Sequence, residues 1–333
     1  MSEPHISVLL DEVIGALSIE PGQKIVDGTF GAGGYTRAFL KAGASVIAFD
    51  RDPTAIAAGQ KNFAGEDALS LIQAPFDRLG QVLTERGLVP VDGAVFDFGV
   101  SSMQLDQAER GFSFMADGPL DMRMGEGRPV ADFINTAKTG DIADVIHQYG
   151  EERRARHIAN LIGSARDEAP LTTTAQLAAV VEKALGRGGK VHPATRTFQA
   201  LRIFINDELG QIVRALIAAE AVLAEGGRLV AVSFHSLEDR IVKRFLASVT
   251  GRTGGGSRHM PEVSGPASTF SALGKALTPG SAEVERNVRA RSATLRAAVR
   301  NAAPAGQWDD ARLAGLGIPP LVFSQLQQSW VSV

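Results

Sequence analysis

The stretch Ile25–Thr36, "IVDGTFGAGGYT", joins a short apolar run to four closely spaced glycines and one acid. The apolar run predicts a buried β-strand, and the glycines predict a tight turn into a helix. Glycine has no Cβ atom, so a ligand can lie directly against the backbone of such a turn. The glycines follow a G-x-G-G pattern, which differs from the G-x-G-x-x-G spacing that seats the pyrophosphate of a dinucleotide. The turn therefore predicts a nucleotide site but disfavours a dinucleotide.

Strand and helix patterns alternate on both sides of this turn. Such alternation predicts an α/β fold with a parallel, doubly wound sheet, in which the carboxyl ends of the strands line one ligand-binding edge. We expect strands at 24–30, 45–50, 69–73, 91–99 and 226–234, and helices at 36–42, 53–63 and 76–87.

An interval of roughly a hundred residues, 105–206, separates the fourth expected strand from the fifth. Its sequence has helical periodicity and is too long for a loop, so it predicts an inserted, smaller helical subdomain. The Gly-, Ser- and Pro-rich stretch after Leu246 predicts a loop. The tail 301–333 is unusually apolar for a free end, and its sequence leaves open whether it packs on the domain, joins subunits or is disordered.

Asp50 ends the second expected strand, about twenty residues after the glycine turn. An acid at this place can accept both hydrogen bonds of a ribose diol. Together with a glycine loop that lacks both a pyrophosphate cradle and a Walker lysine, it suits S-adenosylmethionine. The alternative is structural: the glycines would form only a tight turn, and Asp50 would cap the helix that begins near Pro53.

Three further residues lie at the predicted ligand edge. Asp97 lies near the end of the fourth expected strand and can contact a cofactor or an acceptor, although no Pro-Pro-Tyr follows it as in many amino-group methyltransferases. Phe76 follows the third strand and can stack on an adenine or pack in the core. Asp27 can approach the ligand or hydrogen-bond to nearby backbone amides. Ser101 and Ser102 can start a helix.

Composition limits the class of protein. The 333 residues are 44 % apolar and contain no cysteine, which excludes disulfides and thiolate metal sites. Neither a signal peptide nor an apolar run of membrane-spanning length is evident, so we expect a cytoplasmic protein that does not bind membranes. No His, Asp and Glu group has convincing metal-ligand spacing, and we predict no metal.

Charge is distributed unevenly along the chain. Residues 226–300 contain 12 Lys and Arg against 5 Asp and Glu, a net charge of +7, whereas the remainder of the chain carries −10. This basic strip, which includes Arg240, Lys243 and Arg244, indicates either a solvated face or a surface for phosphates. His192 lies just before a predicted amphipathic helix that contains Arg196 and Arg202. His235 follows the fifth strand, and for each histidine a structural role competes with a functional one.

Several longer strings make the chain similar to one family, the bacterial 16S ribosomal RNA (cytosine-N4)-methyltransferases, also called MraW-like methyltransferases. The resemblance runs from His5 to about Arg296. The strings are "SVLLDEV", "DGTFGAGG", "DRDP", "DFGVSS", "ERGFSF", "DGPLDMRM", "YGEER", "HPATRTFQALRI", "SFHSLEDRIVK" and "RARS". Three departures are Tyr35, where family members often have His, Val288, where Pro is frequent, and the tail after Asn301, which has no recognised counterpart in the family.

The resemblance implies a Rossmann-like class I methyltransferase domain formed by 1–104 and 207–300, with 105–206 as a helical subdomain for RNA recognition. It implies S-adenosylmethionine as methyl donor and 16S rRNA in the small ribosomal subunit as partner. The acceptor would be the N4 amine of a decoding-region (P-site) cytidine, cytidine 1402. The implied cofactor residues are Gly33, Gly34, Tyr35, Asp50, Phe76, Asp97 and Gln104.

We also expect Asp97 and His235 to be needed for methyl transfer, because an acceptor base entering over the fourth and fifth strands would come near both. Two alternatives remain open at this stage: a catalytically silent RNA-binding assembly factor, and a DNA or small-molecule amine methyltransferase on the same fold. The sequence also leaves a homodimer open.

Overall fold

The computed structural model describes residues 7–186, 192–252 and 267–331. By its internal contacts the chain divides into two compact units. Unit 1 comprises 1–99 and 211–318, and unit 2 comprises 100–210 and 319–333. Most of the Gly-rich stretch that the sequence predicts as a loop lies outside the described residues. Within the described part of the chain, no helix is both long and apolar enough to cross a membrane.

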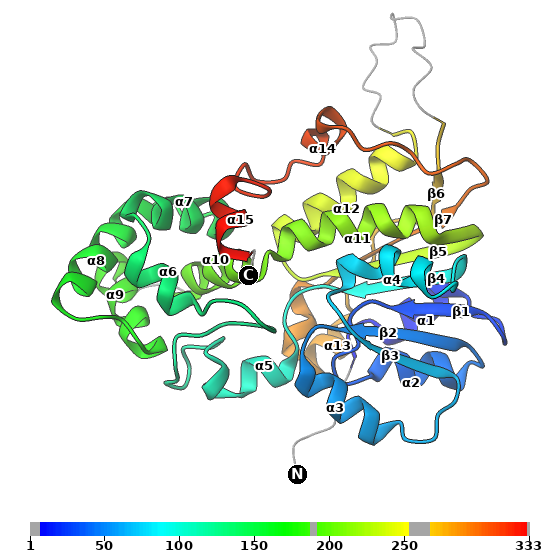
Figure 1. The fold of residues 1–333 in the computed structure, drawn as a ribbon, viewed down its shortest axis with the longest axis horizontal. Helices are drawn as coiled ribbons and strands as arrows, with labels where there is room; N and C mark the ends of the chain where they lie inside the picture. The colour runs from blue at the N-terminus through cyan, green and yellow to red at the C-terminus, as the bar shows by residue number, and fades with distance from the viewer. Residues whose placement is uncertain (1–6, 187–191, 253–266, 332–333) are drawn as a thin grey trace, which may run out of the picture. The chain divides into compact units, whose positions relative to one another are not determined.

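Unit 1 is built on one seven-stranded sheet with the order β3-β2-β1-β4-β5-β7-β6 (Figure 1). The first five strands run parallel, whereas β7 is antiparallel to both β5 and β6. This arrangement confirms the predicted Rossmann-like α/β class. The strands are β1 (Lys24–Asp27), β2 (Ser45–Asp50), β3 (Leu69–Gln73), β4 (Val91–Asp97), β5 (Leu223–Ser233), β6 (Phe270–Ala272) and β7 (Thr294–Arg300).

Helices cover the sheet because its strands are apolar on both faces, as is usual for a parallel sheet. Helices α1 (Leu10–Leu17) and α2 (Gly34–Lys41) bury Leu9, Val13, Tyr35 and Phe39 against strand residues such as Val46, Val95 and Val230. The other helices of this unit are α3 (Pro53–Asn62), α4 (Leu79–Glu85), most of α11 (Glu208–Val222), α12 (Ser236–Val249), α13 (Ser281–Arg286) and α14 (Asp310–Gly315), with short 3-10 turns at Phe76–Arg78 and Val288–Ser292.

The order of the strands defines the ligand edge. The chain passes from β1 outward through β2 to β3, and then returns to place β4 on the other side of β1. In open α/β sheets, ligands bind at the carboxyl ends of the strands where the order reverses in this way. The residues that follow β1 and β4 therefore face the site.

Unit 2 is mainly helical, which confirms the predicted helical insert. Apolar faces of neighbouring helices form its core, in which Phe133, Tyr149 and Phe204 are fully buried. The part of the tail after 318 packs in this same unit. Its helices are α5 (Ser102–Asp106), α6 (Val130–Thr136), α7 (Thr139–Gly150), α8 (Ala155–Glu168), α9 (Thr174–Leu185), α10 (Thr195–Asn206) and α15 (Gln325–Val331), and a 3-10 turn spans Ala108–Arg110.

Candidate active site

The glycine turn after β1 is tightly packed by protein atoms. A Cβ atom on Gly28 would lie 2.4 Å from the Phe96 ring, and one on Gly33 would lie 2.7 Å from Phe63. Gly33 also has a positive φ of 77° and is the N-cap of α2. A Cβ on Gly31, by contrast, would meet no atom closer than 3.9 Å. Packing thus explains Gly28 and Gly33, and a positive φ of 53° favours glycine at Gly31 as well, where the space beside the backbone is uncrowded.

Asp50 closes the turn from the neighbouring strand. Its carboxylate accepts hydrogen bonds from the backbone N–H groups of Gly31 and Asp52, each at 2.8 Å. Burial raises the pKa of Asp50. Each carboxylate oxygen can accept a second hydrogen bond, so the group can still bind a ligand hydroxyl. The cap of α3 is a different residue, Asp52, whose side chain accepts from the N–H of Thr54.

Asp27 has a structural role. Its buried carboxyl accepts hydrogen bonds from the Thr29 N–H at 3.1 Å and the Thr36 hydroxyl at 2.7 Å. Burial is the main cause that raises its pKa from 3.8 to about 6. The Thr29 hydroxyl in turn accepts from the N–H of Asp97 at 2.8 Å, which joins the ends of β1 and β4.

Asp97 presents a carboxyl oxygen that other groups do not use. Its Oδ1 atom is inaccessible to solvent and has no hydrogen-bond partner among the described residues. Burial, followed by the negative charges of Asp27 and Glu238, raises its pKa well above the usual value. A buried carboxyl oxygen without a hydrogen bond lowers the stability of the ligand-free protein. It suits a ligand that brings a cation or a hydrogen-bond donor.

Aromatic rings line the same edge. Phe76 is half-buried and lies 5.9 Å from Phe96 and 5.8 Å from Phe98, measured between ring centroids. Phe96 and Phe98 stack on each other at 5.7 Å. Phe76 is thus supported from beneath while part of it stays exposed, an arrangement that can bind a planar base.

Two residues of the predicted cofactor set have other contacts. Tyr35 is buried, stacks on Phe39, and donates its hydroxyl hydrogen to the Val8 carbonyl, so only its backbone can face a ligand. Gln104 belongs to unit 2, where its side chain accepts from the N–H of Ser101 and completes a capping box at the start of α5. This confirms that a helix begins at Ser101 and Ser102.

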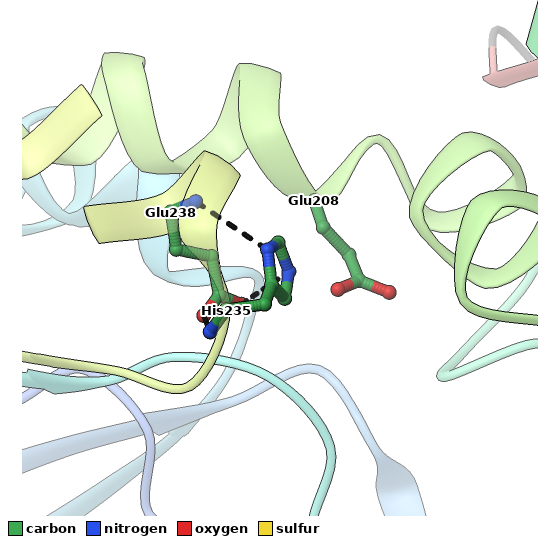
Figure 2. A group of neighbouring side chains, drawn as sticks. All are labelled: Glu208, His235 and Glu238. Carbon is green, nitrogen blue, oxygen red and sulfur yellow. Dashed lines mark hydrogen bonds and ion pairs between the residues drawn. The ribbon is translucent and has the colours of Figure 1, made fainter. Parts of the chain in front are cut away.

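His235 is the N-cap of α12 and interacts mainly with Glu238 (Figure 2). Its Nδ1 accepts from the Glu238 N–H at 3.5 Å, and its Nε2 lies 3.0 Å from the Glu238 carboxylate. That fully buried carboxylate also accepts from the N–H groups of Phe234 and His235. The Nε2 atom is nevertheless buried without a hydrogen-bond partner among the described residues, because its approach to the Glu238 carboxylate lacks hydrogen-bond geometry. The Nδ1 contact caps α12 and gives His235 a structural role at the carboxyl end of β5.

Glu238 was not predicted from the sequence. A signal for it exists, because His235 and Glu238 have the i, i+3 spacing of a capping box, with His in the place of the usual Ser or Thr. Figure 2 also draws Glu208, whose carboxylate forms a bidentate ion pair with Arg202 in unit 2. Arg202 thus has a structural contact.

The basic strip divides into structural and exposed cations. Arg296 forms a bidentate pair with Asp239, and buried Arg300 donates to three backbone carbonyls. Lys243 and Arg244 on α12 are exposed. The exposed cations are therefore the ones available for phosphates.

The chain is similar to known ribosomal RNA methyltransferases. The chain is 56% identical over 309 residues to "Ribosomal RNA small subunit methyltransferase H" of Caulobacter vibrioides, covering 90% of this chain and 97% of that protein. A protein of the same name from Rhizorhabdus wittichii is 56% identical over 306 residues, covering 90% and 94%. An rRNA methylase structure from Streptococcus thermophilus is 13% identical with a TM-score of 0.38, covering 90% and 99%, and this distant likeness adds nothing to the assignment.

A sequence model described as the MraW methylase family matches residues 2–301. The match covers both segments of the sheet, the helical insert between them, and every residue of the predicted site. The chain belongs to the MraW methylase family.

Proposed function

We propose that this protein transfers a methyl group from S-adenosylmethionine to the N4 amine of a cytidine in 16S rRNA, within the small ribosomal subunit in the cytoplasm. The proposed nucleotide is cytidine 1402 of the decoding region. The observation that carries the proposal is the unsatisfied carboxyl oxygen of Asp97, which lies where the strand order reverses. The family and the names of the relatives support ribosomal RNA as the substrate.

The site residues fit the chemical groups of the donor. Asp50 would accept the ribose hydroxyls, Phe76 would stack on the adenine, and the Asp97 carboxyl would face the positively charged end. When bound, S-adenosylmethionine supplies an electrophilic methyl group on a sulfonium. The proposed set is completed by Gly33, Gly34 and Tyr35 through their backbone, and by Gln104.

The remaining task of the protein is to position the acceptor. The lone pair of the cytosine N4 amine is delocalised into the ring, so the amine must be held in line with the methyl–sulfur bond. A stacked base must leave its helix or loop to reach such a site. We propose that Asp97 helps to hold the donor or the amine. We assign His235 to positioning, because its Nδ1 accepts from the backbone N–H of Glu238 and so fixes the start of α12.

A labelled-donor assay tests the function. The purified protein is incubated with methyl-labelled S-adenosylmethionine and, separately, small ribosomal subunits lacking the modification, naked rRNA, DNA and a metabolite extract. We expect label in 16S rRNA, recovered as N4-methylcytidine after nuclease digestion and mass spectrometry. Label on carbon C5 would overturn the chemistry, since that reaction ordinarily needs a cysteine nucleophile. Absence of donor binding in calorimetry would favour a silent assembly factor.

A further inference from the structure

Phe114 and His192 form a stacked pair in unit 2. Their ring centroids are 4.4 Å apart and the ring planes differ by 26°. Buried Phe198 contacts Phe114 edge-on at 5.0 Å, so Phe114 is held between the core and the imidazole. The His192 side chain is 35% exposed. The pair therefore extends the aromatic core out to the surface.

Hydrogen bonds fix the plane of the His192 ring. Its Nδ1 accepts from the N–H of Ala194 at 3.2 Å, and its Nε2 lies 2.8 Å from the Glu182 carboxylate. This pattern assigns the hydrogen of the neutral ring to Nε2. A ring held from both sides loses little conformational entropy when a ligand stacks on it.

The loop that carries Phe114 also exposes a large apolar side chain. Met115 is 83% exposed, although the loop around it is tightly closed. A Cβ on Gly111 would lie 2.1 Å from the Pro119 carbonyl oxygen, and one on Gly118 would lie 1.9 Å from that of Ala108. Met115 is thus exposed on a closed loop and is the next residue in sequence after Phe114.

Exposed arginines also lie on unit 2. Arg196, four residues after His192, is 58% exposed. Its Nη1 atom lies 3.4 Å from the Glu151 carbonyl oxygen and 3.6 Å from the Glu152 carboxylate. This contact joins the start of α10 to the turn that precedes α8, and three more exposed arginines lie in that turn and at the start of α8. They are Arg153, Arg154 and Arg156.

We propose that Phe114, Met115 and His192 form a stacking platform for an unpaired nucleobase of the RNA substrate, next to arginines that contact its phosphates. Single-stranded RNA is recognised by this combination, in which bases stack on aromatic or histidine rings and cations follow the backbone. The positive charge selects RNA over an apolar protein segment as the occupant. The proposal rests on the proposed function and names the surface of unit 2 that holds the substrate.

The principal test replaces His192 and measures steady-state kinetics with small ribosomal subunits. His192→Ala should raise the KM for subunits about 5-fold or more, the effect of losing one stacked base. The turnover and the affinity for S-adenosylmethionine should remain as in the wild type. His192→Tyr loses the contact with Ala194 but keeps a ring on which a base can stack. Because stacking carries the binding, this variant should recover most of the affinity for subunits that His192→Ala loses. A merely structural histidine would not be rescued by tyrosine.

Met115→Ala supplies a second, independent variant, because an exposed side chain can be truncated without unfolding the protein. It should raise the same KM, whereas Leu277→Ala, the matched control at an exposed apolar residue of unit 1, should not. If His192→Ala and Met115→Ala both keep the wild-type KM while the wild type methylates subunits, the platform is wrong and the proposed function stands. If the wild type transfers no methyl group, binding of a labelled single-stranded oligoribonucleotide to wild type and His192→Ala still decides the platform.

Discussion

At the scale of single residues, the ligand edge combines acids with different tasks. Both carboxyl oxygens of Asp27 accept hydrogen bonds from neighbouring donors, and Asp50 accepts one from the Gly31 N–H of the glycine turn. Asp97 has one carboxyl oxygen without a hydrogen-bond partner among the described residues. These differences arise from the local hydrogen bonds, since all three carboxyls end parallel strands of one sheet. Each acid therefore predicts a different response to substitution.

Asp50→Asn should weaken the binding of S-adenosylmethionine. The substitution preserves the shape but replaces one acceptor oxygen with a donor and removes the charge, which typically costs about 1.5–3 kcal/mol for a charged hydrogen bond. We expect a loss of affinity of about 10-fold or more in calorimetry. Asp92→Asn is the matched control, because Asp92 accepts from the Lys24 N–H at the opposite edge of the sheet. Equal losses in both variants would contradict a ligand role for Asp50.

Asp27 should make stability depend on pH. Its folded-state pKa of about 6 lies above its ordinary value of 3.8, so the folded protein binds the proton more tightly than the unfolded chain. Its contribution to stability is therefore greatest below pH 4 and is lost as the pH rises through 6, by about 3 kcal/mol in total. Asp27→Asn should remove this slope in urea unfolding between pH 4.5 and 7. Parallel pH profiles for the two proteins would disprove the assignment.

At the scale of elements, the start of α12 depends on the His235–Glu238 capping box. His235→Ala should reduce stability by about 1 kcal/mol, as loss of an N-cap does, and lower turnover with donor affinity nearly intact. His235→Asn restores a good N-cap and should recover stability together with most of the turnover. The measurements are urea unfolding and single-turnover methyl transfer. Recovery of stability without recovery of turnover would instead make His235 a catalytic residue.

At the scale of the whole molecule, the C-terminal tail contributes to both units. Trp308 donates to the buried Glu220 carboxylate and stacks on Phe245 in unit 1. Trp330 packs edge-on against Phe133 in unit 2, beneath the Arg128 guanidinium at 3.8 Å. The tail follows the segment that matches the family model, yet its side chains complete two separate cores.

The two tryptophans should therefore stabilise different parts of the chain. Trp330→Ala removes a nearly buried indole, a change that typically costs about 3–5 kcal/mol, and should speed hydrogen exchange in α6, α7 and α10. The sheet should stay protected. Trp308→Ala is the reciprocal control and should speed exchange in α11 and α12. Uniform acceleration across both units in either variant would show that they unfold as one.

The sequence alone determined the parts of this protein that depend on local pattern. Alternating apolar runs predicted β2 and β3 to the residue and placed Asp50 at the end of its strand. They extended the fourth strand to 99, whereas β4 ends at Asp97. Helical periodicity predicted the insert. These elements can be predicted because a strand or helix repeats its apolar pattern over a few neighbouring residues. The ligand edge can be predicted because parallel strands bring their carboxyl ends to one edge of the sheet.

Only the tertiary structure decided the features that join distant residues. It added the antiparallel β6 and β7, divided the tail between two units, and stacked His192 on Phe114. It also decided that Asp27 is satisfied while Asp97 keeps an unpaired oxygen. The physical reason is that the burial of a side chain and its hydrogen-bond partners depend on residues from segments that are distant in the sequence. A local sequence pattern does not specify which of these segments pack together.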